Sequence, residues 1–189
     1  MNRITALPLS LPLALLLALS ACKEEGAASA IPPPLELTEE AAGHYCQMII
    51  LEHEGPKAQV HVAGYPQPFW FSQVRDGLAF LKSPEQLGEV LVVYVNDMGA
   101  ARSWADPGEG NWIRARDAFF VVGSDAKGGM GAPEIVPFAT REGAEAFALE
   151  HGGKVMTLDE IPVDAVLSPI DLTSSTTDTT DTLKTEITE

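Results

Sequence analysis

Between residues 38 and 160, short apolar runs alternate with polar and turn-forming stretches, a pattern that predicts strands and helices in turn. Apolar, β-branched or alternating runs predict strands at Cys46–Glu52, Ala58–Ala63, Pro68–Phe71, Val90–Asn96, Ile113–Ala115, Ala118–Val122, Ile135–Phe138 and Lys154–Leu158. Ser72 is the expected N-cap of a helix that ends near Leu81. Thr140 is the expected N-cap of a second helix, which ends near His151 at a pair of glycines.

The two helices sit in similar surroundings, which indicates an internal duplication. Phe71 and Phe80 are nine residues apart at the two ends of the first helix, and Phe138 and Phe147 have the same spacing around the second. A repeat of this length is typical of a duplicated unit. We therefore expect an α+β fold made of two related β-β-α-β units, residues 38–98 and 99–168, that form one compact domain pair.

The first residues have the pattern of an export signal. Arg3 precedes an almost wholly apolar run, Leu7–Leu19, which is too short to span a bilayer. The run ends in Leu-Ser-Ala-Cys, which resembles the bacterial lipobox. That resemblance implies a signal peptide over residues 1–21, export across the inner membrane and a lipid on Cys22. Lys23 follows that cysteine in place of Asp, which in enteric bacteria favours the outer membrane over the inner.

Two segments outside the units have compositions that do not favour folding. Residues 22–37 combine charged, small and proline residues, and we expect a lipid-anchored linker there. Residues 169–189 are rich in Thr, Ser, Asp and Glu and predict a disordered acidic tail, to which we assign no role.

The charge balance excludes one class of partner. The chain has 27 Asp and Glu residues against 12 Lys and Arg residues, a formal net charge of −15. Nucleic-acid binding needs clustered basic residues, so we expect no nucleic-acid partner. An acidic surface also gives no electrostatic grip on anionic lipid, so the lipid anchor would have to hold the protein at the membrane.

The cysteine count raises a question about Cys46. The chain has two cysteines, and a lipid on Cys22 would leave Cys46 without a partner in the chain. A lone thiol in an oxidising compartment is a liability. Cys46 is therefore buried and inert, paired with another chain, or chemically active.

The residues around Cys46 offer soft metal ligands. On a strand, Cys46 and Met48 would point to the same face, and His44 would share it if the strand extends back that far. A thiolate beside a thioether selects Cu(I) over hard cations. The alternative is that Cys46 and Met48 pack in a hydrophobic core.

A third soft donor lies far along the chain. Met130 is flanked by glycines in a Gly-rich loop, where an apolar side chain would serve as a metal ligand, a contact to a partner protein or a cap over the core. His53, His61 and Met98 are weaker ligand candidates, and His151 lies at a helix end, where a cation is favoured.

Sequence signatures of enzymes are missing. The chain contains no Gly-x-Ser-x-Gly elbow, no phosphate-binding loop and no His-Glu-x-x-His. A thiol-redox enzyme would need a second cysteine close to Cys46. We therefore expect a protein that handles a metal and is not an enzyme.

Four sequence segments together resemble the NosL family of copper-binding lipoproteins, the accessory proteins of nitrous oxide reductase. They are Tyr45-Cys46-Gln47-Met48-Ile49-Ile50, Gly129-Met130-Gly131, Pro137-Phe138 and His151-Gly152-Gly153-Lys154-Val155. The resemblance spans about residues 38 to 160 and adds the lipobox at Cys22.

The resemblance implies a lipid-anchored periplasmic chaperone that binds one Cu(I) and delivers it for the copper-sulfide active site of nitrous oxide reductase. It also implies a fold of two β-β-α-β halves. The expected partners are the membrane ABC-transporter complex of that system and the reductase itself. By this resemblance Cys46, Met48 and Met130 are the expected metal ligands, with His44 and His151 as further candidates. The competing hypothesis is a metal-free lipoprotein adaptor that docks on an envelope transporter complex through the Gly-rich loop.

Overall fold

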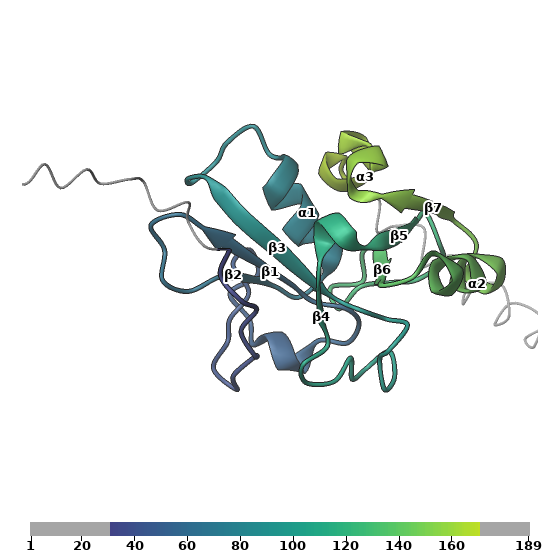
Figure 1. Cartoon of the computed structure of the whole chain (residues 1–189), viewed down its shortest axis with the longest axis horizontal. Coiled ribbons are helices and arrows are strands. Elements are labelled where there is room, and N and C mark those ends of the chain that lie inside the picture. The colour runs from purple at the N-terminus through teal and green to yellow at the C-terminus, as the bar shows by residue number, and fades with distance from the viewer. Residues whose placement is uncertain (1–30, 171–189) are drawn as a thin grey trace, which may run out of the picture. The chain divides into compact units, whose positions relative to one another are not determined.

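Two antiparallel sheets organise residues 31–170, the part of the chain that this computed structural model describes (Figure 1). The first sheet has the strand order β2-β1-β3-β4, formed by β1 (Ala58–Val62), β2 (Phe69–Phe71), β3 (Val90–Asn96) and β4 (Trp112–Arg114). The second has the order β6-β5-β7, formed by β5 (Phe119–Val122), β6 (Val136–Phe138) and β7 (Lys154–Thr157). The expected signal peptide, Cys22 and the acidic tail from residue 171 onward lie outside the described residues.

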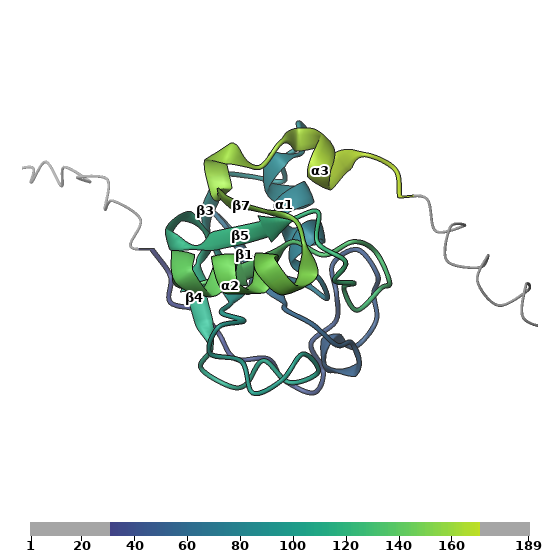
Figure 2. The ribbon, with the colours of Figure 1, turned by 90° about the vertical axis from the view of Figure 1, so that its right-hand side faces the viewer.

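One longer helix packs on each sheet. The helices are α1 (Val74–Lys82), α2 (Arg141–His151) and α3 (Val163–Leu167), with single 3-10 turns η1 (Ile50–Glu52), η2 (Ala115–Asp117) and η3 (Leu158–Glu160). Helix α1 packs on β1, β2 and β3 and contacts α3, whereas α2 covers β5, β6 and β7 (Figure 2). Within residues 31–170, every helix is too short or too polar to cross a bilayer.

The two halves of the chain repeat the same arrangement. Each sheet places the first strand of a β-β-α-β unit between the second and the third. The aromatic pairs expected from the sequence also recur, because Phe71 packs on Phe80 at 5.6 Å between ring centroids and Phe138 packs on Phe147 at 5.3 Å. The α+β fold with two related units is therefore confirmed. Strand β4, which we expected in the second unit, instead pairs with β3 and extends the first sheet.

Both units contribute to the main hydrophobic core. Val60, Leu78 and Val95 from the first unit are fully buried in one cluster with Phe120 and Ile161 from the second. A smaller cluster lies under α2. Because the main core is shared, the packing that stabilises one unit also holds the other, and loops of both units are supported by the same core.

Part of the expected linker is bound to the first sheet. The N–H of Leu35 donates to Gln59 Oε1 at 2.9 Å, and Gln59 Nε2 donates back to Leu35 O at 3.0 Å. The Tyr94 hydroxyl donates to Pro32 O at 2.8 Å. Residues 31–37 therefore cover one face of the sheet, which the proline-rich composition of this stretch does not predict.

The two main helices begin in different ways. At α2 the expected cap is confirmed, since Thr140 Oγ1 accepts a hydrogen bond from Gly143 N at 3.1 Å. At α1 the prediction that Ser72 is the cap is wrong. The N-cap is Gln73, and its side chain makes no capping bond. The buried carboxylate of Glu134 accepts hydrogen bonds from the first N–H groups of this helix instead.

Candidate metal centre

Cys46 lies in a tight turn, and the predicted strand at Cys46–Glu52 is wrong. The N–H of Gly43 donates to Met48 O at 2.9 Å, and the N–H of Gln47 donates back to Gly43 O at 2.8 Å. Gln47 has a positive φ of 57°, which a strand does not contain. The segment then enters η1. Cys46 and Met48 therefore share a turn, and the alternation of a strand does not orient them.

The Cys46 thiol is free and half-buried at the edge of this turn. Its Sγ lies 3.9 Å from the Ser72 hydroxyl oxygen, which belongs to the residue after β2. Gly43 allows this position, because a Cβ on that residue would collide with Cys46 Sγ. The turn thus holds the sulfur in contact with the segment that leads into α1.

Met130 is carried by a closed loop of the second unit. Lys127 and Pro133 form an isolated bridge at the base of the loop, and Gly128 N donates to Ala132 O at 2.8 Å. Met130 N donates to the side-chain oxygen of Gln73 at 3.3 Å. Met130 as a residue is 41% exposed.

The loop is seated between two segments of the first unit. On one side, His53 Nδ1 hydrogen-bonds to Gly129 O at 3.1 Å. On the other, Gly128 lies so close to Gln73 and Glu134 that a Cβ there would stand 2.7 Å from Glu134 Oε2. Glycine is therefore required at this approach.

Cys46 and Met130 each contact one of two consecutive residues, Ser72 and Gln73. Cys46 contacts Ser72, and the backbone of Met130 is bonded to Gln73, the next residue along the chain. Met48 lies on the same turn as Cys46 and is 45% exposed. Two of the three sulfur residues expected from the sequence, Cys46 and Met130, are thus attached just before α1, and Met48 shares the turn of Cys46.

His44 is next to this site and is enclosed by aromatic rings. Its ring lies 4.5 Å from that of Phe69 and 5.5 Å from that of Phe80, measured between centroids. Burial lowers the pKa of His44 below its ordinary value of 6.5. Burial therefore favours the neutral imidazole, which is the form that ligates metals.

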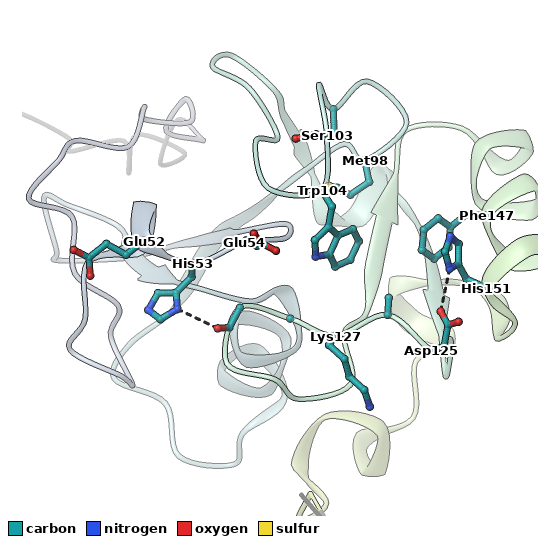
Figure 3. Close-up of a pocket in the computed structure, with 14 residues that line it drawn as sticks. Glu52, His53, Glu54, Met98, Ser103, Trp104, Asp125, Lys127, Phe147 and His151 are labelled. Carbon is teal, nitrogen blue, oxygen red and sulfur yellow. Dashed lines mark hydrogen bonds and ion pairs between the residues drawn. The ribbon is translucent and has the colours of Figure 1, made fainter. Parts of the chain in front are cut away.

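His151 belongs to a separate feature. Its ring stacks on Phe147 at 4.2 Å, and its Nδ1 hydrogen-bonds to Asp125 Oδ1 at 3.0 Å. Both His151 and His53 line a cleft of about 880 Å³, with Trp104 between them (Figure 3). The structure does not bring His151 into the group of residues around Cys46. Met98 also lines this cleft, whereas His61 is buried under the first sheet against Gln59.

Two buried ionisable side chains, Glu134 and Lys57, lie close to each other in this region. Burial raises the pKa of Glu134 to about 8, although its backbone N–H partners oppose this shift. Burial also lowers the pKa of Lys57 to about 8, and the nearby Glu134 partly offsets this shift. Ser72, Gln73 and Glu134 are the polar residues of the site that the sequence did not identify. The only sequence signal for Ser72 and Gln73 is that they precede a predicted helix, and the only one for Glu134 is that it follows the Gly-rich loop.

Within residues 31–170, no group of three or more His, Cys, Asp and Glu side chains is arranged to hold a metal ion. A hard divalent cation needs several oxygen or nitrogen ligands. The soft or neutral donors on the Cys46 turn and the Met130 loop are a thiol, two thioethers and an imidazole. Thiol and thioether donors suit a soft monovalent ion.

Comparison with known proteins identifies the family. A family model described as NosL matches residues 34–166. The copper-binding lipoprotein NosL of Achromobacter cycloclastes is 54% identical over 168 residues, which cover 88% of this chain and 86% of that protein. The copper-binding lipoprotein NosL of Stutzerimonas stutzeri is 36% identical over 152 residues, covering 79% and 77%.

A solved structure agrees with these sequence matches. The crystal structure of the copper chaperone NosL from Shewanella denitrificans superposes with a TM-score of 0.64 at 38% sequence identity. The match covers 69% of this chain and 97% of that chain. These relatives are named as a copper-binding lipoprotein and a copper chaperone, and not as enzymes. The fold, the sequence motifs and these matches agree, and the chain belongs to the NosL family.

Proposed function

We propose that this protein is a lipid-anchored, periplasm-facing Cu(I) chaperone that delivers copper for the copper-sulfide active site of nitrous oxide reductase. The names of its relatives, a copper-binding lipoprotein and a copper chaperone, support the copper part of this proposal. The lipobox ending at Cys22 supports the anchor, and Lys23 favours the outer membrane.

One observation carries the proposal: two loops from different units attach to consecutive residues before α1, Cys46 to Ser72 through its thiol and Met130 to Gln73 through its backbone N–H. A cysteine and a methionine packed for core stability alone would be buried. Here Cys46 is half-buried, and Met130 and Met48 are exposed. The arrangement leaves the soft donors accessible to an ion and to a partner protein.

The chemistry of loading and release follows from the ligand types. Cys46 loses its proton when it binds Cu(I), because the metal lowers the pKa of a coordinating thiol. The thiolate supplies most of the affinity. Met130 and Met48 supply neutral thioethers, which are weaker and exchangeable. His44 offers a neutral imidazole beside them.

Transfer is a ligand substitution with no change in the oxidation state of copper. A donor of the partner attacks Cu(I) on its exposed side and displaces a thioether first. Displacement of the Cys46 thiolate completes the transfer, and Cys46 takes up a proton again. The ion is held by at least one protein throughout, so it is never released into solution.

The partners are the membrane ABC-transporter complex of the nitrous oxide reductase system and the reductase itself. The lipid anchor keeps the protein at the membrane, where it can meet that complex. The acidic net charge of −15 suits a protein that carries a cation and does not bind nucleic acid.

Titration with a Cu(I) competitor under anaerobic conditions tests the proposal. The wild-type protein is expected to bind one Cu(I) tightly, and Cys46→Ala to lose tight binding. Met48→Ala and Met130→Ala are expected to weaken it. Met156→Leu, which removes a thioether from β7, serves as the matched control and is expected to bind like the wild type.

Wild-type stoichiometry and affinity in Cys46→Ala would refute the site. A wild-type protein that binds no copper at all would favour the metal-free adaptor instead. X-ray absorption of the loaded protein counts sulfur against nitrogen ligands and decides whether His44 takes part.

A further inference from the structure

Gln73 is a buried amide that joins the start of α1 to the loop of the second unit. Gln73 is only 3% exposed. The side-chain oxygen accepts a hydrogen bond from Met130 N at 3.3 Å, and Nε2 donates to Asp76 Oδ2 at 2.9 Å. The bond to Asp76 orients the amide, so that its oxygen faces the loop.

Gln73 is free for this contact because another residue caps the helix. An N-cap side chain ordinarily accepts from the first helical N–H groups. Here Glu134 does so, since its carboxylate accepts from Val74 N at 3.3 Å and from Arg75 N at 2.9 Å. The carboxylate also accepts from Ile135 N at 2.8 Å. The N-cap residue of α1 is thereby available to hold a distant loop.

The same short segment also touches the other ligand-bearing turn. Ser72 is 2% exposed, and its hydroxyl oxygen lies 3.9 Å from Cys46 Sγ. Ser72 and Gln73 are therefore two consecutive buried residues, of which the first contacts Cys46 and the second contacts Met130. Among the described residues, the only side-chain acceptor for the Met130 N–H is the oxygen of Gln73.

We propose that Gln73 is a positioning residue of the copper site: its side-chain amide holds the backbone of Met130 beside Cys46, so that the thioether can reach the bound Cu(I). This rests on the proposed function. Gln73 itself has no soft donor and does not bind the ion. It acts through Met130, and its loss leaves the Cys46 thiolate in place.

The expected effect is moderate. A single hydrogen bond between a side chain and the backbone changes an equilibrium by roughly 3- to 10-fold. Gln73→Leu keeps the buried volume but offers no acceptor, so the Met130 loop should detach more often. Cu(I) affinity is expected to fall by roughly 3- to 10-fold, which is far less than the loss in Cys46→Ala.

The first test uses the copper-free protein. Amide hydrogen exchange of Met130, followed by NMR, should become faster in Gln73→Leu. Gln86→Leu is the matched control, because Gln86 Nε2 also donates to backbone oxygens of the α1 end, at Phe80 and Ser83. This control should leave Met130 exchange unchanged. Unchanged Met130 exchange in Gln73→Leu would overturn the proposal.

The second test uses the copper-loaded protein. X-ray absorption should count one sulfur ligand fewer in Gln73→Leu than in the wild type. In a Met130→Ala background, Gln73→Leu should cause no further loss of Cu(I) affinity, since the group on which it acts is gone. An equal loss in both backgrounds would mean that Gln73 acts on the fold in general, and would also overturn the proposal.

Two outcomes separate this proposal from the chaperone proposal. If Met130→Ala leaves affinity and sulfur count unchanged, Gln73 has no ligand to position, while Cu(I) binding by Cys46 still stands. If Cys46→Ala binds like the wild type, the chaperone site itself fails. Should Gln73→Leu not fold, Gln73→Asn replaces it. The shorter amide keeps the polarity but does not reach Met130 N, and it should give the same results.

Discussion

Replacing Glu134 with glutamine tests the balance of charge and burial beneath the site. The carboxylate is 1% exposed and accepts hydrogen bonds from Val74, Arg75 and Ile135. Burial raises the pKa of Glu134 from 4.5 to about 8 in the folded protein. Glutamine has nearly the same shape and keeps one acceptor oxygen, but it cannot ionise.

The shift predicts a definite dependence of stability on pH. The folded protein holds the Glu134 proton up to pH 8, whereas the unfolded chain loses it near pH 4.5. The contribution of this proton is fully present below pH 4.5 and is lost as the pH rises to 8. At about 1.4 kcal/mol for each unit of pKa, the loss amounts to about 5 kcal/mol. Glu134→Gln lacks this loss.

Urea unfolding followed by tryptophan fluorescence, at pH values from 5 to 8.5, measures the effect. The free energy of unfolding of Glu134→Gln relative to the wild type should rise steadily across this range. Glu145→Gln removes an exposed carboxylate from α2 and controls for the change in net charge. If the free energy of unfolding of the wild type instead rises relative to that of the variant as the pH rises, the reasoning is wrong. Lys57 and the three N–H donors would then lower the pKa of Glu134 by more than burial raises it.

Two further substitutions follow from single contacts. Gly43→Ala would place a Cβ against Cys46 Sγ and 3.3 Å from Ile50 Cδ1, so it should displace the sulfur. A competitor titration should then show a lower Cu(I) affinity. Unchanged affinity would contradict the close approach of Gly43 to the sulfur. Thr140→Ala removes the acceptor for Gly143 N, so urea unfolding should show a free energy of unfolding lower by about 1 kcal/mol. Cu(I) affinity should stay unchanged. A loss of affinity would mean that α2 contributes to the site.

Local signals in the sequence were enough for most of the fold. The alternating run at β1 and the continuous apolar run at β3 gave both strands, since their patterns arise from burial of one or both faces. The cap at Thr140 was equally local. The cap of α1 was missed because Glu134, which supplies it, lies 60 residues away from Val74. Patterns within a short window carry no information about such a contact.

The turn at Cys46 was misread for a different reason. Met48 to Leu51 is an apolar run that resembles a strand, yet only Ile50 within it is buried. Close packing at Gly43 and the positive φ of Gln47 turn the backbone there. Neither Gly43 nor Gln47 signals this strongly, because glycine is common in loops and glutamine seldom adopts a positive φ.

Residue chemistry predicted which side chains to examine, but it did not predict what holds them. Cys46 and Met130 attract attention because thiols and thioethers are rare and soft. Ser72 and Gln73 are ordinary polar residues, and their role depends on two contacts that each join distant parts of the chain. Such positioning residues become visible only when the loops are seen together.

The proposed ligands are divided between the two units, and this division bears on how the proposed chaperone both holds and releases an ion. Cys46 is on a turn of the first unit, and Met130 is on a loop of the second. The shared core beneath them includes Phe71 and Phe120, which are fully buried, so it does not have to move when either loop does. Cu(I) affinity can then depend on a few contacts at Ser72 and Gln73, each of which contributes little free energy. Under this proposal, a partner that competes with these contacts loosens the ion without unfolding the protein, which a site built inside the core would not allow.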